Sequence, residues 1–181
     1  RFTSQNPNNP NIEDHRFSPD ITPMEYATNG AGDYRIAALS ARNSNGDSVT
    51  DVRYVSHKIY DGKPSLPGLP ATFDREGKAQ TLEVETLDAV TGLKATLLYT
   101  VFEDYPVLAK SVRLENTGSA ALTLERAFSS CLELPTMDLD MVHVYGHWHK
   151  ENTPVRPPLQ HGLQGTQHKR GLTGDHPHPL L

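Results

Sequence analysis

Two pairs of carboxylates stand two residues apart in the chain, Glu83 with Glu85 and Asp138 with Asp140. On a β-strand this spacing puts both members of a pair on one face, with their backbones roughly 6.6 Å apart. That separation is near the range of the acid pairs of glycosidases. Catalytic carboxylates normally come from different elements, so that a sugar fits between them, whereas an alternating glutamate is typical of the wet face of a half-buried strand. We therefore interpret these carboxylates as solvent-exposed.

Three histidines near one another could bind a metal ion. His143, His147 and His149 have one strand parity, and imidazoles at such spacing ligate zinc or copper. No further ligand stands at a recognised spacing, and such short patterns are weak signals. We therefore predict no metal at these histidines, and the sequence indicates no cofactor.

Cysteine, which can act as a nucleophile, and tryptophan, which can stack on a sugar, each occur once in the sequence. Cys131 lies in the apolar run "AFSSCLELP" and cannot make an internal disulfide, so we interpret it as a small buried core residue rather than a nucleophile. Trp148 is the single tryptophan. Its aromatic face suits either core packing or stacking on a sugar, and the sequence leaves both open. Nucleophile-elbow, phosphate-loop and dinucleotide motifs are absent from the sequence.

In residues 51–73, "DVRYVSHKIYDGKPSLPGLPATF", a stretch with several charged residues is followed by a loop rich in proline and glycine. Proline fixes φ, and glycine supplies turns that other residues resist. One interpretation is a rigid platform presented to another surface, and the other is a plain corner between two strands. The side chains that such a platform would present include Asp51, Arg53, His57 and Lys63.

Composition limits the class of protein. The 181 residues are 36% hydrophobic and 22% charged, which suits one globular domain or a large piece of one. With 17 basic and 22 acidic side chains the net charge is −5, so we expect neither nucleic acid nor a membrane as partner. One cysteine and the lack of an apolar secretion signal favour a cytoplasmic location.

The polar and apolar pattern predicts strands. Residues 93–101 alternate with period two, residues 107–115 return after the turn "EDYP", and "NTGSA" turns the chain again. A helix over 97–102 is the competing prediction, but the β-branched content and the turns favour strand. The chain is thus predicted to be all-β, an antiparallel sandwich. We expect an extended connection over 1–23, the sandwich strands over 24–149, and a Pro/Gly/His-rich loop segment of the same domain over 150–181.

The stretch 51–73 also carries a family resemblance. Together with "MEYATNGAGDYRIAAL" before it, "TGLKATLLYTVFEDYPVLAKSVRLENTG" after it and "KRGLTGDHPHP" near the end, it resembles the N-terminal part of bacterial α-galactosidases of glycoside hydrolase family 36. The resemblance is collinear from about Phe17 to the last residue. It implies a galactose mutarotase-like β-supersandwich, incomplete at both ends here, that precedes a catalytic (β/α)8 barrel and a small β domain.

The resemblance also implies a function. The parent enzyme would hydrolyse terminal α-linked galactose from melibiose or raffinose by a retaining mechanism, with both catalytic aspartates in the barrel and none in this segment. Such enzymes are commonly tetramers with this domain at the subunit contacts. Candidates for the substrate rim or the interface are then Asp51, Arg53, His57, Lys63 and Trp148. The alternatives are a stand-alone carbohydrate-binding sandwich, which needs exposed aromatic platforms, and a mutarotase-like sugar epimerase, which needs a His and Glu acid/base pair.

Overall fold

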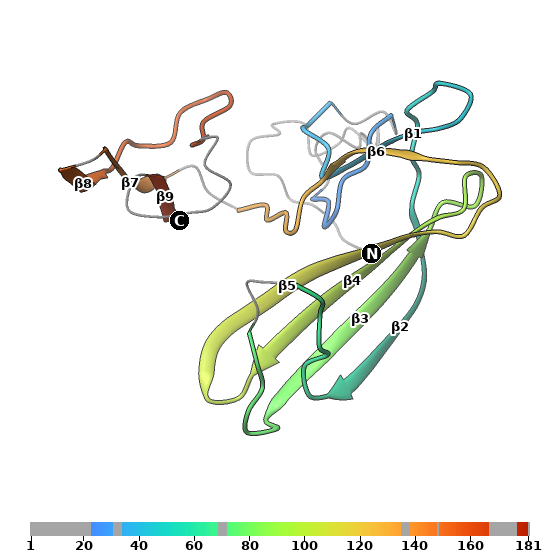
Figure 1. Cartoon of the computed structure of the whole chain (residues 1–181), viewed down its shortest axis with the longest axis horizontal. Helices are drawn as coiled ribbons and strands as arrows, with labels where there is room; N and C mark the ends of the chain where they lie inside the picture. Colours follow the sequence, from blue (N-terminus) through green and yellow to red (C-terminus); the bar gives the residue numbers. More distant parts are fainter. Residues whose placement is uncertain are drawn as a thin grey trace, which may run out of the picture. The chain divides into compact units, whose positions relative to one another are not determined.

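The computed structural model has nine strands and no helix within the residues it describes, which confirms the predicted all-β antiparallel class (Figure 1). The chain divides into two compact units, residues 1–133 and residues 134–181. No helix in the described part of the chain is long and apolar enough to cross a membrane. The described residues are 23–30, 34–68, 72–134, 138–147, 149–166 and 177–180.

A four-stranded antiparallel sheet forms the body of the first unit (Figure 1). The strands follow one another in chain order as a meander, which confirms the predicted pairing of residues 93–101 with 107–115. The strand predicted after the turn "NTGSA" does not continue this sheet, because it pairs elsewhere. Residues 97–102 lie in a strand, and the helix considered for them is wrong. The strands are β2 (Arg53–Asp61), β3 (Ala79–Leu87), β4 (Leu93–Phe102) and β5 (Tyr105–Asn116).

A short ribbon covers one end of the sheet's inner face, which we define as the face that bears Leu93, Ala95 and Leu97. The ribbon pairs β1 (Leu39–Arg42) with β6 (Thr123–Ala127) in antiparallel fashion. Leu39 is fully buried against this face, and burial of such a side chain stabilises the fold by about 1.5–3 kcal/mol. Cys131 packs against the same core but is half-buried rather than buried as predicted.

The rest of the inner face is not covered by the described residues. Ile59, Val101 and Leu108 are 67%, 51% and 54% exposed. The strand register puts these side chains on the same face as Leu97. An apolar surface of this kind on one sheet face marks a place where other protein packs.

The second unit is a three-stranded antiparallel sheet. Its central strand is β7 (Val142–His147), which lies within the stretch 24–149 for which strands are predicted. The stretch 150–181, predicted to be loop, contains the outer strands β8 (Lys150–Val155) and β9 (Pro177–Leu180). Both are edge strands, where a proline such as Pro154 or Pro179 needs no partner for a missing N–H.

The first compact unit ends at residue 133. The sequence instead predicts a single set of sandwich strands over residues 24–149. The predicted connection over 1–23 lies almost wholly outside the described residues and stays a prediction.

Candidate functional site

The candidate residues at the start of β2 form a local ion pair. The Arg53 guanidinium donates from Nε to Asp51 Oδ2 at 2.9 Å, and the pair is largely exposed. The backbone N–H of Asp51 donates to Asp88 Oδ2 at 3.1 Å, which fixes the chain as it enters the strand. An exposed pair of this kind adds little to the stability of the fold.

A β-bulge brings His57 next to Tyr54. The register of β2 against β3 shifts between Tyr54 and Ser56, which leaves Val55 as the extra residue. Residues three apart on a regular strand point to opposite faces, but the bulge puts Tyr54 and His57 on the same face. The Tyr54 hydroxyl and His57 Nδ1 are 2.6 Å apart in a hydrogen bond, and both side chains are exposed.

The structure does not gather the sequence-based candidates into one site. Lys63 follows the far end of β2, and the strand alone keeps its two ends roughly 26 Å apart. Lys63 is half-buried in the first turn of the proline-rich loop. Trp148 and Pro70 lie outside the described residues. The assignment of these residues to a substrate rim or an interface stays a prediction.

Glu83 corrects the interpretation of the strand carboxylates as solvent-exposed, because it is 4% exposed. It lies on the outer face of the sheet, the face opposite the core cluster. Its carboxylate accepts from Tyr60 Oη at 3.1 Å and pairs with Lys58 and Arg113, each at 3.2 Å. These partners come from β2 and β5, on either side of the central strands, so the carboxylate is enclosed by cations rather than by water.

Two other carboxylates of the two pairs, Glu85 and Asp140, are also bound to cations. Glu85 is half-buried and accepts from Lys94 at 2.8 Å and Ser56 at 3.0 Å. Asp138 and Asp140 are exposed, as predicted, and Asp140 pairs with Arg156 at 2.6 Å.

Electrostatics argue against general-acid chemistry at these groups. Burial opposes the ionisation of Glu83, but the hydrogen bonds from Lys58 and Tyr60 and the charges of Lys58 and Arg113 outweigh it, so its pKa lies below the ordinary value. The hydrogen bond from Lys94 lowers the pKa of Glu85. Since a glycosidase acid needs a raised pKa to hold its proton, neither glutamate fits that role.

Among the described residues, no group of three or more His, Cys, Asp or Glu side chains is arranged to hold a metal ion. His143 lies on β7 with its Nδ1 buried, and that atom has no hydrogen-bond partner among the residues that the structure describes. The sequence expectation of no metal at His143, His147 and His149 stays a prediction.

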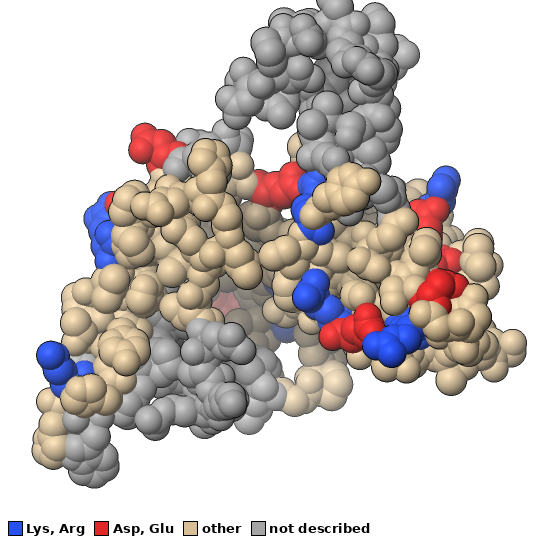
Figure 2. Space-filling view, turned by 90° about the horizontal axis from the view of Figure 1, so that it is seen from above, with Lys and Arg blue, Asp and Glu red and all other residues tan. Residues whose placement is uncertain are grey.

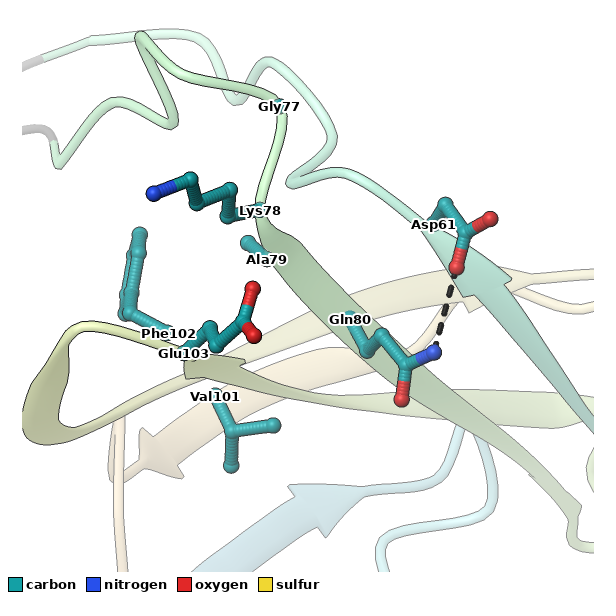
Figure 3. A pocket seen from close by; sticks show the side chains of 8 residues that line it. All are labelled: Asp61, Gly77, Lys78, Ala79, Gln80, Val101, Phe102 and Glu103. Atoms are coloured by element: carbon teal, nitrogen blue, oxygen red, sulfur yellow. Dashed lines mark hydrogen bonds between the residues drawn. The ribbon is translucent and has the colours of Figure 1, made fainter.

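A cavity of about 560 Å³ lies at the distal end of the four-stranded sheet, which we define as the end that holds Asp61 and the β4–β5 turn (Figure 3). Gln80 Nε2 donates to Asp61 Oδ1 at 3.2 Å across one side, and the Glu103 carboxylate lies beside Phe102 on the other (Figure 3). The volume is that of a small-molecule site, roughly 300–1,000 Å³. The lining residues are Asp61, Gly77, Lys78, Ala79, Gln80, Val101, Phe102 and Glu103.

Charged side chains on the visible face of the molecule lie in small mixed groups of both signs rather than in one basic field (Figure 2). The four-stranded sheet and its turns also carry ion pairs, such as Lys78 with Asp104 at 2.7 Å. A mixed surface of this kind lacks the concentrated positive charge that attracts nucleic acid.

A model of the glycosyl hydrolase family 36 N-terminal domain matches residues 1–181. The chain belongs to glycoside hydrolase family 36. The match spans the stretch 51–73 and confirms the resemblance that these residues carry.

Named relatives extend the family assignment. Alpha-galactosidase AgaA of Geobacillus stearothermophilus is 41% identical over 174 residues, which is 96% of this chain and 24% of that protein. The bifunctional alpha-galactosidase/sucrose kinase AgaSK of Mediterraneibacter gnavus is 37% identical over 93% of this chain and 18% of that protein. The chain therefore spans about a quarter or less of the length of these relatives.

Solved structures of the family share the fold. A substituted form of AgaA, crystallised in complex with raffinose, matches with a TM-score of 0.86 at 41% identity, over 93% of this chain and 24% of that one. Another substituted form, in complex with stachyose, matches with the same TM-score over 98% of this chain and 25% of that one. The family 36 fold thus covers both units of the chain.

Sequence reasoning missed the distal-end cavity of this family 36 domain. Its polar residues Asp61, Gln80 and Glu103 come from the end of β2, the start of β3 and the β4–β5 turn. No spacing rule links three segments of this kind, since the register of the sheet alone brings them together. The available signal was the turn "EDYP" between two predicted strands, which places Glu103 at a sheet end.

Proposed function

We propose that this chain is the non-catalytic N-terminal part of a longer α-galactosidase that removes terminal α-linked galactose from melibiose- and raffinose-type oligosaccharides. The observation that carries the proposal is the 41% identity to alpha-galactosidase AgaA across 96% of the chain. In this proposal the reaction takes place in the cytoplasm, uses no cofactor and depends on carboxylates outside these residues.

In this proposal the domain shapes the entrance of the active site and holds the subunits together. Two features support this role. The Asp51–Arg53 pair is exposed and its groups can bind other polar partners. The apolar inner face around Ile59 and Val101 is uncovered among the described residues and suits contact with more protein.

The carboxylates support the non-catalytic part of the proposal. Among the described residues, each carboxyl group with a clearly shifted pKa has that pKa shifted downward. Such groups stay ionised at neutral pH and cannot protonate a leaving group.

Kinetics and sedimentation of the full-length protein test the proposal. We expect it to release galactose from raffinose as an oligomer. Replacement of Asp51 and Arg53 by alanine should raise KM for raffinose several-fold or shift the protein to a smaller assembly. The matched control is Arg42→Ala, which removes a similar exposed ion pair with Glu125 on the β1–β6 ribbon.

Two results would count against the proposal. Failure of the full-length protein to release galactose would refute the activity. Unchanged KM and unchanged assembly in the Asp51 and Arg53 variants would refute the role of this part of the domain.

A further inference from the structure

Strand β2 forms an open edge of the four-stranded sheet (Figure 1). It pairs with β3 on one side, and no strand in the described part of the chain pairs with its other side. Every residue from Arg53 to Asp61 is exposed except Tyr60, which is half-buried. The backbone N–H and C=O groups along this side are therefore available to pair with another strand.

The features that commonly prevent pairing at a sheet edge do not block β2. The bulge leaves Val55 as an extra residue near its start, but residues 56–61 pair with β3 in an unbroken register. The Lys58 ammonium lies 3.2 Å from Glu83 Oε1, so it is held over the outer face of the sheet. At the opposite edge, β5 contains Pro106, which has no N–H to donate, whereas β2 contains no proline. Strand β2 is thus the edge better suited to pairing.

The side chains of β2 are complementary to those of a second copy that runs antiparallel to it. The sheet register puts His57, Ile59 and Asp61 on the inner face, and Lys58 and Tyr60 on the outer face. A two-fold axis at Ile59 sets His57 opposite Asp61 of the second copy. It also sets Lys58 opposite Tyr60, and the two Ile59 side chains opposite each other. Each pair joins groups that attract: an imidazole with a carboxylate, an ammonium with an aromatic ring, and two aliphatic side chains.

Local hydrogen bonds orient the imidazole and the carboxylate of this arrangement. His57 Nδ1 lies 2.6 Å from the Tyr54 hydroxyl, and Asp61 Oδ1 accepts from Gln80 Nε2 at 3.2 Å. Within the residues that the structure describes, His57 Nε2 and Asp61 Oδ2 have no hydrogen-bond partner. When the Tyr54 hydroxyl donates to Nδ1, the hydrogen of the neutral imidazole is on Nε2. That N–H can then donate to the Asp61 carboxylate of the second copy.

Other registers lack this complementarity. A two-fold axis at Lys58 puts two ammonium groups opposite each other, which is unfavourable. An axis at His57 sets Asp61, on the inner face, against Arg53, on the outer face, because the bulge shifts the strand parity. The residues of β2 therefore favour the register centred on Ile59.

We propose that two copies of the protein associate through their β2 edges, with a two-fold axis at Ile59, so that two four-stranded sheets become one continuous sheet. The inference rests on the proposed function, because it names the contact by which this domain holds subunits together. Such a contact is isologous, since the same strand is used by both copies. Edge pairing uses backbone groups in the plane of the sheet and leaves the apolar inner face to further protein.

Disulfide crosslinking of the full-length protein tests the proposal. Ile59→Cys puts two thiols directly opposite each other, with Cα atoms about 4.5–5.5 Å apart in an antiparallel pair. This separation suits a disulfide. We expect mild oxidation to give a covalent dimer that the unsubstituted protein does not form. Far-UV circular dichroism establishes that each variant is folded.

Val55→Cys is the matched control, because Val55 is a β-branched residue of the same strand that is 54% exposed, against 67% for Ile59. The proposed register separates the two copies of this residue by roughly 26 Å along the strand, so it should form no disulfide.

A charge exchange tests the same register without a disulfide. His57→Asp sets two carboxylates opposite each other twice in the pair of copies, so it should weaken association about tenfold. Addition of Asp61→Lys to that variant should restore association, as measured by sedimentation of the full-length protein. Failure of the second substitution to restore association would overturn the proposed register.

Three crosslinking outcomes would also overturn the proposal. One is an oligomer in which Ile59→Cys forms no disulfide, and another is equal crosslinking of Val55→Cys. The third is a thiol at position 59 that neither crosslinks nor reacts with a small thiol reagent, which would mean that another part of the longer protein covers the edge. Galactose release from raffinose by the unsubstituted protein tests the proposed activity separately, since its absence would leave the crosslinking result intact.

Discussion

The Glu83 carboxylate couples the stability of the first unit to pH. Its pKa in the folded protein lies below the ordinary value of 4.5, because the contacts with Lys58, Tyr60 and Arg113 outweigh burial. A lowered folded-state pKa means that the ionised carboxylate stabilises the fold above the ordinary pKa. This contribution is lost as pH falls through the lowered pKa. We therefore expect the free energy of unfolding of the first unit to fall in acid, because Glu83 becomes protonated.

Glu83→Gln should lower the free energy of unfolding by about 1–3 kcal/mol at neutral pH, because a charged hydrogen-bond acceptor is removed. Its cationic partners Lys58 and Arg113 are more than half exposed, so they are not left as buried charges. Urea unfolding of the variant and of the original chain should converge as pH falls through the lowered pKa of Glu83.

Glu115→Gln serves as the control here and should change the free energy of unfolding by less than about 0.5 kcal/mol. An equal loss for Glu83→Gln at neutral and acid pH would contradict the electrostatic account.

Strand parity predicted that Glu83 and Glu85 share a face but not that Glu83 is buried. Arg113 is 30 positions away in the sequence and reaches Glu83 through the register of β3, β4 and β5. A pattern along one strand contains no information on what the neighbouring strands contribute. The same limit applies to Tyr54 and His57, because the bulge that joins them depends on the pairing with β3.

At the level of elements, two turns lock one end of the sheet. Gly92 in the β3–β4 turn has φ of +76° and accepts hydrogen bonds from the Thr117 backbone at 2.9 Å and hydroxyl at 2.7 Å. A Cβ on Gly92 would lie 2.5 Å from the Gly118 nitrogen in the next turn. Glycine is thus required here both for its backbone conformation and for the close approach of two chains.

Gly92→Ala should destabilise the chain by about 2–5 kcal/mol, the sum of a left-handed backbone and a backbone clash. Gly46→Ala is the matched control, since Gly46 has φ of +94° but nothing within 4 Å of its added Cβ. That control should cost only about 1–2 kcal/mol. Equal losses in thermal or urea unfolding would mean that the contact between the turns contributes nothing.

The proline-rich loop after β2 is the second element with a testable role. In the full-length protein, replacement of Pro64, Pro67 and Pro70 by alanine should raise KM or weaken the oligomer more than it lowers Tm. The physical reason is that proline limits the freedom of the free loop and so reduces the ordering cost of binding. A lower Tm with unchanged kinetics and assembly would instead indicate a plain corner between strands.

Local pairing explains which elements the sequence predicted. The pairing of β4 with β5 was predicted because these neighbours in the chain are joined by a short turn, but the third strand predicted after "NTGSA", β6, pairs with β1 instead of β5. The β1–β6 ribbon was not predicted, since it joins residues such as Arg42 and Glu125 that are 83 positions apart. Strands β8 and β9 were missed because their prolines are compatible only with edge positions, which composition does not reveal.

At the scale of the whole molecule, the uncovered part of the inner face should drive association of the isolated 181-residue chain. Ile59 and Val101 are more than half exposed there. We expect sedimentation to show species larger than a monomer at high concentration, and Ile59→Lys with Val101→Lys to reduce them. Val90→Lys is the control, because Val90 is exposed on a turn. A monomer with a sharp cooperative melt would contradict this expectation.

The central claim is that this chain is a non-catalytic part of an α-galactosidase, and hydrolysis of an aryl α-galactoside tests it most directly. We predict turnover by the full-length protein and none by the purified 181-residue chain, since its strand carboxylates are ion-paired or solvent-exposed. Turnover by the isolated chain that persists through purification to homogeneity and disappears in Asp138→Ala or Asp140→Ala would contradict the account.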